Sequence, residues 1–247
     1  MAGSVQARLP VEPEVELARA RADLEALTGA IRHDLRAPLR AIIGFAEALC
    51  EDCGDRLGPD GAAYAERIVA AARSLDQLVV DLAAYCRLGS QPLTLGAVAV
   101  ADAVADALTA IDDQQLVASA AVEVAGDLPR VRAHAPTLAK ALAQLIDNAL
   151  RYRKPDVAPR VRVYATGGMG PQTVRVWVED NGIGIPPEHH ADIFGVFERL
   201  HGVEHYPGTG IGLALVRRGV ERMGGAAGVE SVPGEGSRFW IELPAAP

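Results

Sequence analysis

Three polar side chains near the middle of the chain share one face of a predicted helix. Asn148, Arg151 and Tyr152 stand at positions i, i+3 and i+4, which are neighbours on a helix surface. A neutral amide oxygen and a cation in this arrangement can hold a magnesium ion and phosphate oxygens. The end of an ordinary amphipathic helix has the same pattern, and these residues alone favour that simpler interpretation.

A second stretch, 179–186, directly follows a predicted strand. A carboxylate on its buried side can accept a hydrogen bond from an exocyclic amine, and glycines let the backbone approach a flat ring closely. The residues of this stretch that we select as candidates are Asp180, Gly182, Gly184 and Ile185.

A third stretch, 208–213, is rich in glycine and leads into a predicted helix whose free N–H groups and dipole favour phosphate. No strand precedes it, as a dinucleotide fingerprint requires, and no Gly-Lys-Ser/Thr follows, as a Walker loop requires. A hinge or a tight turn explains the glycines about as well. The candidates here are Gly208, Thr209, Gly210, Gly212 and Leu213.

Near the N-terminus, His33 stands beside Asp34 in a long predicted helix. The helix is indicated by apolar residues at spacings of three and four, which form one buried seam: Leu17, Leu24, Leu27, Ile31, Leu35, Pro38, Ile42, Phe45 and Leu49. Because His33 falls between two seam residues, we expect its side chain to point away from the core. A lone histidine is more often structural than catalytic.

Two helices must carry this region. Residues 1–13 predict a loose leader, a first helix runs from 14 to about 52, and glycines with a proline predict a turn over 53–61. A heptad seam then marks a second helix: Tyr64, Ile68, Ala71, Leu75, Leu78, Leu82 and Tyr85. One hairpin cannot bury both of its apolar faces, so we expect 14–90 to form a homodimeric four-helix bundle.

The second domain, 91–247, follows a break at Gly89–Pro92. Its pattern predicts strands at 93–95, near 122 and 131, at 161–163, 174–178, 227–231 and 238–243, and helices over 100–111, 136–152 and 212–223. Because no regular βαβ repeat is present, we expect an α+β sandwich with helices on one face of a mixed sheet.

Composition excludes several classes of function. The chain has 247 residues and a formal net charge of −8, so no nucleic acid or anionic membrane is expected as a partner. No signal peptide opens it and no apolar run approaches the ~18 residues of a membrane span, which predicts a cytoplasmic protein. Cys50 and Cys53 form a C-x-x-C pair without the further ligands of a zinc site, so we interpret them as incidental thiols.

The order and spacing of these stretches resemble the two-component sensor histidine kinases, in which a HisKA-type dimerisation and phosphotransfer hairpin precedes a Bergerat-type ATP-binding domain. The match runs from about residue 14 to the C-terminus. Its motifs are the H box 33–39, the N box 145–152, the G1 motif 180–186, the F box 193–200 and the G2 motif 208–213. The sequence from Arg199 to Gly202 and on to Tyr206–Gly208 is most similar to kinases of phytochrome-type sensors.

The resemblance implies a role for each stretch. His33 would accept the phosphoryl group of ATP, and Asp34 would orient its ring and help to take its proton. Arg199, with Arg151, would neutralise phosphate charge during transfer. The three stretches described first would bind ATP, with Asp180 on the adenine amine and Tyr152 beside the nucleotide. A mobile lid is implied over 202–207.

Three positions depart from the family pattern. Gln144 stands where an asparagine is common, so Asn148 and Gln144 would together hold Mg²⁺ with one longer side chain. His134 replaces a helix-capping aspartate. Ala37 replaces the threonine or asparagine that helps water to dephosphorylate the partner regulator, which predicts weak or absent phosphatase activity.

The resemblance implies a kinase that phosphorylates itself on His33 and passes the phosphoryl group to an aspartate of a response regulator receiver domain. An upstream sensor domain or protein would feed its signal into the coiled coil. One alternative is a phosphotransfer or scaffold dimer with an inactive ATP site. Another is an ATPase or serine kinase of the same Bergerat fold, which would need no histidine hairpin.

Overall fold

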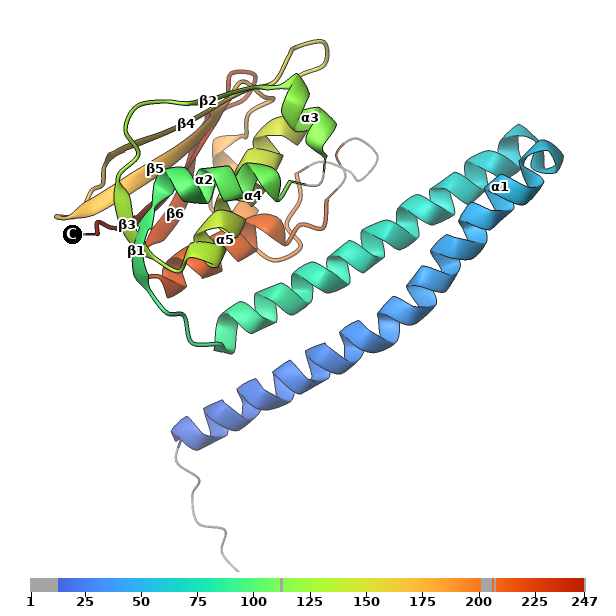
Figure 1. Cartoon of the computed structure of the whole chain (residues 1–247), viewed down its shortest axis with the longest axis horizontal. Helices are drawn as coiled ribbons and strands as arrows, with labels where there is room; N and C mark the ends of the chain where they lie inside the picture. The colour runs from blue at the N-terminus through green and yellow to red at the C-terminus, as the bar shows by residue number, and fades with distance from the viewer. Residues whose placement is uncertain (1–12, 112, 201–205, 207, 247) are drawn as a thin grey trace, which may run out of the picture. The chain divides into compact units, whose positions relative to one another are not determined.

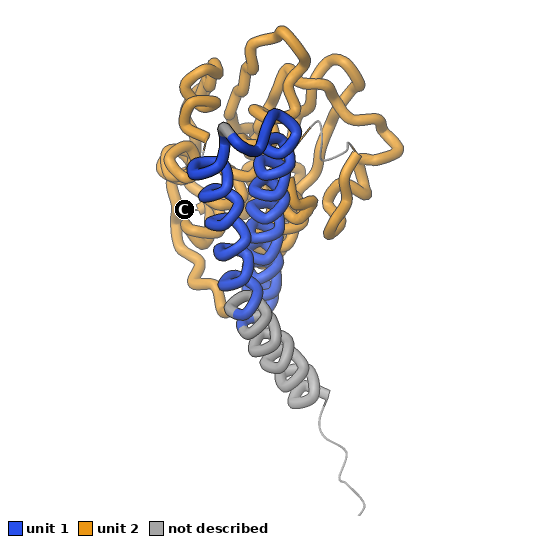
Figure 2. Tube along the Cα trace, turned by 90° about the vertical axis from the view of Figure 1, so that its right-hand side faces the viewer, with its two compact units in different colours: residues 1–90 blue, residues 91–247 orange. Residues whose placement is uncertain are grey.

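The computed structural model describes residues 13–111, 113–200, 206 and 208–246, and the side chains of 13–28, 30–33 and 55 lie outside that description. The chain divides into two compact units, 1–90 and 91–247 (Figure 2), which are treated separately below.

Unit 1 is a helical hairpin. Its helix, α1 (Pro13–Ser90), is interrupted at Gly58, where φ is 65° and ψ is 174° (Figure 1). A positive φ costs glycine little, and Pro59 then suits the first turn of the returning arm. The predicted turn over 53–61 is therefore too long, because the residues on both sides of Gly58 remain helical.

Ion pairs and small side chains hold the two arms of the hairpin together. Arg36 Nε lies 3.1 Å from Asp76 Oδ1, and Arg73 Nη2 lies 2.5 Å from Glu47 Oε1. The buried residues of the hairpin are mostly small: Leu39, Ala46, Ala65, Ala72, Val79, Asp81, Ala83 and Ala84. Small side chains let two helices approach closely, so this contact leaves the larger apolar residues outside it.

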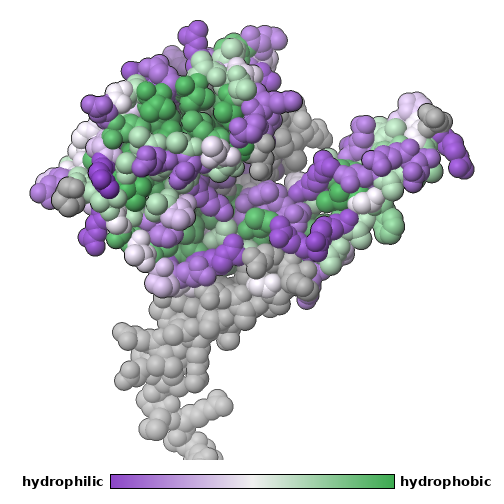
Figure 3. All heavy atoms as spheres, in the orientation of Figure 1, coloured by the Kyte–Doolittle hydropathy of each residue, from purple (hydrophilic) through white to green (hydrophobic). Residues whose placement is uncertain are grey.

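Much of the seam that the sequence predicts as buried is exposed in the single chain. Its members are between 40% and 79% exposed: Leu35, Ile42, Phe45, Leu49, Tyr64, Ile68 and Leu75. In the view of Figure 3, hydrophobic residues reach the surface of the hairpin among hydrophilic ones. The periodicity correctly marks one face of each arm, but that face is not covered by the other arm.

Unit 2 is an α/β sandwich. Its helices are α2 (Val100–Thr109), α3 (Gln114–Ser119), α4 (Ala135–Arg151) and α5 (Gly212–Arg222), with short 3-10 turns at Pro187–His189 and Asp192–Phe194. Its strands are β1 (Gly96–Ala99), β2 (Ala121–Val124), β3 (Arg130–Ala133), β4 (Arg160–Gly167), β5 (Thr173–Asp180), β6 (Ala226–Val232) and β7 (Gly236–Pro244).

A five-stranded sheet in the order β2-β4-β5-β7-β6 forms the base of unit 2, and it is mixed, as the sequence predicts. Only β2 and β4 are parallel, and β1 pairs with β3 in a separate antiparallel sheet. The helices lie on one face of the large sheet (Figure 1). The predicted strand at 93–95 is wrong, since the strand begins at Gly96, while Leu93 and Leu95 pack against the core from a loop. Helix α3 was not predicted.

Alternation along the strands separates the two faces of the sheet. Val174, Val176 and Val178 of β5 are buried against the helices, chiefly against the apolar stripe of α4. On the opposite face, Tyr164, Trp177 and Trp240 stand side by side across β4, β5 and β7. Both tryptophans of the chain therefore lie on the outer face of unit 2.

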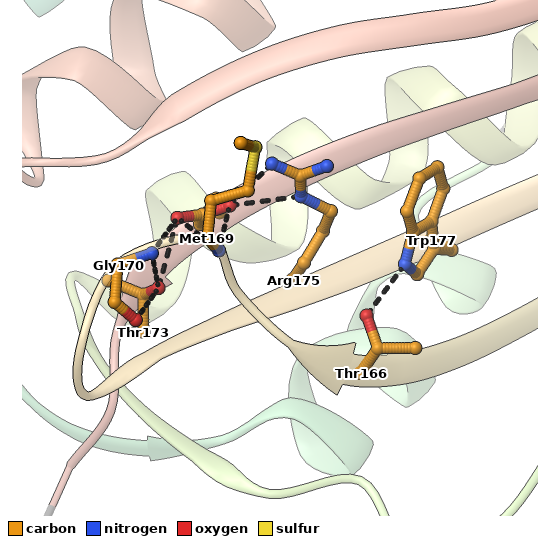
Figure 4. Close-up of polar contacts among 7 residues, drawn as sticks. Thr166, Met169, Gly170, Thr173, Arg175 and Trp177 are labelled. Carbon is orange, nitrogen blue, oxygen red and sulfur yellow. Dashed lines mark hydrogen bonds and ion pairs between the residues drawn. The ribbon is translucent and has the colours of Figure 1, made fainter.

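The outer face is held by a network around Glu242 (Figure 4). Its carboxylate accepts hydrogen bonds from Arg175 Nε and Nη2 at 2.9 and 2.7 Å and from Thr173 Oγ1 at 2.9 Å. The backbone N–H groups of Met169 and Gly170 also donate to it. Burial raises the pKa of Glu242, but these donors outweigh burial and hold the pKa below its usual value. The carboxylate thus fixes the β4–β5 turn to β7.

Candidate functional site

Helix α4 presents two amide side chains, Gln144 and Asn148, one turn apart on the same face. Both residues are half-buried, and no described residue forms a hydrogen bond with either amide group. A Cβ added to Gly212 would collide with Gln144 Oε1, so this oxygen lies against the first residue of α5. The structure therefore brings Gln144, the residue just before the N box, against the G2 motif.

The start of α5 adds N–H donors to this place. Its N-cap residue, Ile211, provides no side-chain hydrogen bond, and its first turn holds no acidic residue. Thr209 and Gly210 just before it are half-buried, whereas Leu213 packs partly into the core. An uncapped helix N-terminus with no acidic side chain nearby favours an anion.

Arg151 and Asp147 form an ion pair on α4. Arg151 Nε donates to Asp147 Oδ2 at 2.6 Å. The other carboxylate oxygen, Asp147 Oδ1, is buried and has no hydrogen-bond partner among the described residues. The guanidinium group of Arg151 is therefore held along the helix by an acidic neighbour.

Asp180 is the largely buried carboxylate at the end of β5. Its Oδ1 accepts from the backbone N–H groups of Gly182 at 2.8 Å and Ser237 at 3.1 Å, and no described residue donates to Oδ2. Burial raises the pKa of Asp180 to about 6, although both N–H donors oppose the shift. Asp180 is thus mostly ionised at pH 7 and has one oxygen open to a further donor.

The loop after Asp180 is fixed from two sides. A Cβ on Gly182 would collide with the carbonyl oxygen of Tyr152, which also accepts from Ile183 N at 3.0 Å. Gly184 has a φ of 72°, and a Cβ there would collide with the carbonyl oxygen of Val232. Ile185 N donates to Ser231 Oγ at 2.8 Å. The glycines are therefore required for close approach to the backbone of other segments, whereas the sequence predicts their close approach to a flat ring.

The F box closes against the G2 motif. Phe197, with a φ of 67°, donates its N–H to the carbonyl of Gly210 at 2.9 Å. Arg199 donates from Nη1 to the carbonyl of Gly208 at 2.6 Å and from Nη2 to that of Tyr206 at 2.8 Å. The Tyr206 ring lies 5.0 Å from the ring of Tyr152, centroid to centroid. Burial raises the pKa of Tyr152, while Arg199 and Arg151 oppose that shift.

The structure thus brings together the predicted residues of the N box, G1, F box and G2 in unit 2. His33 and Asp34 lie on α1 in unit 1; Asp34 is exposed, and the His33 side chain lies outside the described residues. Most of the predicted lid, 202–205 and 207, also lies outside them.

Sequence reasoning missed the contacts of Tyr206 and of Ser237. An aromatic residue next to a glycine-rich stretch is a usable signal for Tyr206. The N–H of Ser237 leaves no signal, because any residue other than proline supplies that donor.

Two negative findings concern only the residues that the structure describes. Within them, no helix is long and apolar enough to cross a membrane. Groups of three or more His, Cys, Asp and Glu side chains that could hold a metal ion are also absent from them. Gln144 and Asn148 on α4 carry amide groups and do not belong to these four residue types, so this absence does not concern them.

Comparison with known families agrees with this geometry. Residues 23–91 match the His Kinase A (phospho-acceptor) domain. Residues 133–247 match the family described as histidine kinase-, DNA gyrase B- and HSP90-like ATPase. The helical hairpin and the sandwich thus each match a family model.

Among curated proteins, the phytochrome-like protein Cph1 of Synechocystis is 30% identical over 92% of this chain and 30% of its own length. The methanogenesis regulatory histidine kinase FilI of Methanothrix harundinacea is 31% identical over 93% of this chain and 25% of its own. The chain therefore spans about 30% or less of the length of these relatives.

Among solved structures, full-length ShkA in complex with AMPPNP aligns with a TM-score of 0.66 and 28% identity, over 90% of this chain and 46% of that one. The Acinetobacter baumannii histidine kinase AdeS, at 22% identity and a TM-score of 0.59, shares the fold over 87% of this chain and 98% of its own. The chain carries the two domains of the sensor histidine kinase family and is homologous to its phytochrome-type members.

Proposed function

We propose that this chain is a histidine kinase core that transfers the γ-phosphoryl group of ATP to His33 and then to an aspartate of a response regulator receiver domain. The observation that carries the proposal is a convergence in unit 2 of three features: a carboxylate oxygen on Asp180 and two amides, none with a hydrogen-bond partner among the described residues, and a helix N-terminus without a side-chain cap. These groups complement an adenine amine, a hydrated cation and phosphates.

In this proposal, Asp180 Oδ2 accepts from the exocyclic amine of adenine, while Gly182, Gly184 and Ile185 shape the floor beneath the ring. The N–H groups at the start of α5 bind phosphate oxygens, with Gly208–Leu213 placing the chain around them. The burial of Asp180 and the oxygen that no described residue donates to support this role.

The donor set on α4 fits Mg²⁺. This ion prefers oxygen ligands and keeps several waters, so one or two protein groups beside the phosphates suffice. Asn148 and Gln144 would hold it, and the longer side chain of Gln144 already reaches the start of α5. When bound, the ion neutralises charge on the phosphate oxygens.

The proposed phosphotransfer takes place between nucleotide bound in unit 2 (91–247) and His33 of the hairpin, 14–90, in unit 1. A ring nitrogen of His33 attacks the γ-phosphorus, the bond from that phosphorus to the bridging oxygen breaks, and ADP leaves. Asp34 orients the ring through its other nitrogen and helps to take the proton that this nitrogen loses. Because the co-substrate is ATP, we place the reaction in the cytoplasm. Ala37 supplies no hydroxyl or amide beside His33, so we propose little phosphatase activity.

Incubation with γ-labelled ATP and Mg²⁺, followed by a chase with a receiver domain, tests the activity. Wild type should gain an acid-labile, base-stable label and lose it to the receiver, whereas His33→Gln should gain none. A scaffold dimer would gain no label at all. A serine kinase of the same nucleotide fold would give an acid-stable label on another protein, and either result would refute the proposal.

We also propose that the hairpin dimerises through the exposed seam. Phe45, at 79% exposed, and Ile68, at 47%, represent an apolar stripe that runs along both arms. A second copy offers the same stripe, so the two hairpins bury both in a four-helix bundle. Light scattering of Phe45→Glu should give the mass of a monomer.

The control for this substitution is Glu66→Lys, an exposed position on the helix face opposite the seam. It should retain the mass of a dimer. A wild-type monomer, or a dimer that Phe45→Glu leaves intact, would contradict the proposed interface.

A further inference from the structure

The guanidinium group of Arg199 donates to two backbone carbonyl groups. Nη1 donates to the carbonyl of Gly208 at 2.6 Å and Nη2 to that of Tyr206 at 2.8 Å. A planar guanidinium is suited to two parallel hydrogen bonds of this kind, whereas an ammonium group acts as a point charge. A single side chain, that of Arg199, therefore holds the backbone carbonyls of both Tyr206 and Gly208.

That backbone carries Tyr206, which lies against Tyr152. The two rings are 5.0 Å apart and inclined by 32°, and Tyr206 Oη donates to the carbonyl of Arg153 at 3.3 Å. Offset or tilted aromatic pairs at this separation attract one another beyond simple area burial. The Nη2 hydrogen bond of Arg199 and the ring contact with Tyr152 thus both act on Tyr206, the first on its backbone and the second on its side chain.

Tyr152 belongs to the nucleotide site by its backbone contacts. Its carbonyl accepts from Ile183 N at 3.0 Å, and Gly182 packs against that same carbonyl, directly beside the carboxylate of Asp180. Tyr152 is therefore a neighbour of Asp180 and Gly182 through its backbone, and its ring, which is carried by the same residue, is available as a wall beside a bound base. Tyr206 is the aromatic residue that packs on that ring.

We propose that Arg199 is a positioning residue that holds Tyr206 against Tyr152, so that the two tyrosines form one aromatic wall of the nucleotide site. This inference rests on the proposed function, because it assigns a role within ATP binding. It differs from the role that the family resemblance implies for Arg199, which is to neutralise phosphate charge during transfer. The two roles make opposite statements about ADP.

The experiment measures dissociation constants of ATP and ADP, with Mg²⁺, for the whole chain by titration calorimetry. If Arg199 positions Tyr206, then Arg199→Ala and Tyr206→Ala each weaken ATP and ADP by the same factor, about fivefold to tenfold. The double variant should be no weaker than either single one, because both changes remove the same wall. Tyr206→Phe, which keeps the ring, should bind within about twofold of wild type.

Arg217→Ala is the matched control for charge. Arg217 is exposed on α5 and its Nε pairs with Glu221 at 3.2 Å, so its loss removes one cation from unit 2 without touching Tyr206. It should leave both dissociation constants unchanged. Should the alanine variants fail to fold by circular dichroism, Arg199→Lys takes their place and should weaken ATP and ADP equally, since a point charge replaces only part of the fork.

Three results would overturn the inference. One is a loss of ATP binding in Arg199→Ala with ADP binding intact, which assigns Arg199 to the γ-phosphate instead. Another is a double variant whose loss is the product of the two single losses, and a third is unchanged binding in Tyr206→Ala. If wild type bound neither nucleotide, the proposed function itself would fail, which separates that outcome from the other three.

Discussion

Replacing Asp180 with asparagine should stabilise unit 2 while abolishing nucleotide binding. Burial raises the pKa of this carboxyl from 3.8 to about 6, so the folded state binds its proton more tightly than the unfolded chain does. The stability from this group is therefore complete below pH 3.8 and is lost as the pH rises through 6. A shift of this size corresponds to up to about 3 kcal/mol.

Asp180→Asn removes this pH-dependent loss of folding stability. The amide oxygen can still accept from Gly182 N and Ser237 N, and no charge remains to be buried. At pH 8 the variant should be more stable than wild type by up to about 3 kcal/mol, and the difference should vanish near pH 4. Its amide nitrogen would face the adenine amine as a second donor, so ATP binding should be lost.

Urea unfolding followed by tryptophan fluorescence measures this effect, because Trp177 and Trp240 both lie in unit 2. The difference in unfolding free energy between variant and wild type is taken at several values between pH 4 and 8. Asp127→Asn, at an exposed loop position, controls for the loss of one negative charge. A difference that does not change with pH, or a variant less stable than wild type at pH 8, would refute the reasoning.

Three further substitutions test other parts of the structure. Gly212→Ala should weaken ATP binding about tenfold by displacing Gln144 Oε1. The control is Gly96→Ala, where a Cβ meets nothing within 4 Å, and it should bind ATP like wild type. Calorimetry measures both, and a Gly212→Ala affinity equal to that of wild type would contradict the proposed role of this contact. Glu242→Gln should lower the unfolding free energy by about 1–3 kcal/mol in urea unfolding, because charged hydrogen bonds to Arg175 are lost. Ala37→Thr should speed loss of label from a phosphorylated receiver domain, and an unchanged rate would dissociate this position from phosphatase activity.

Periodicity was sufficient to predict most of unit 2. Alternation at Val174, Val176 and Val178 correctly predicts β5, and the three-and-four spacing of α4 predicts its helix almost to the residue. Both patterns report a buried face directly, because each element packs one face against the other. The short helix α3 has no fully buried residue, so it leaves no comparable pattern.

The errors arose where tertiary packing decides between local alternatives. Glycines at 54 and 61 suggest a long turn, but helix on both sides of Gly58 tolerates them and a single positive φ reverses the chain. Leu93 and Leu95 are apolar because they cover the core from a loop, and the β1 ladder begins only where β3 can pair with it.

The sequence proposes the residue types of the candidate site, but it does not indicate which backbone groups form hydrogen bonds with them. The carboxylate of Asp180 and the glycines of G1 and G2 follow from position and chemistry. The hydrogen bond from Ser237 N spans 57 positions, and the carbonyl contacts of Arg199 depend on the backbone of a loop. Neither contact has a signature in the spacing of side chains, since backbone groups are common to all residues.

Identification of the phosphorylated residue after incubation with Mg²⁺ and ATP tests the central claim most directly. Phosphorus NMR and mass spectrometry of the whole chain should show one phosphohistidine, at His33, that is lost in acid and kept in base. A phosphoryl group on a serine or threonine, or on a histidine other than His33, would contradict the account.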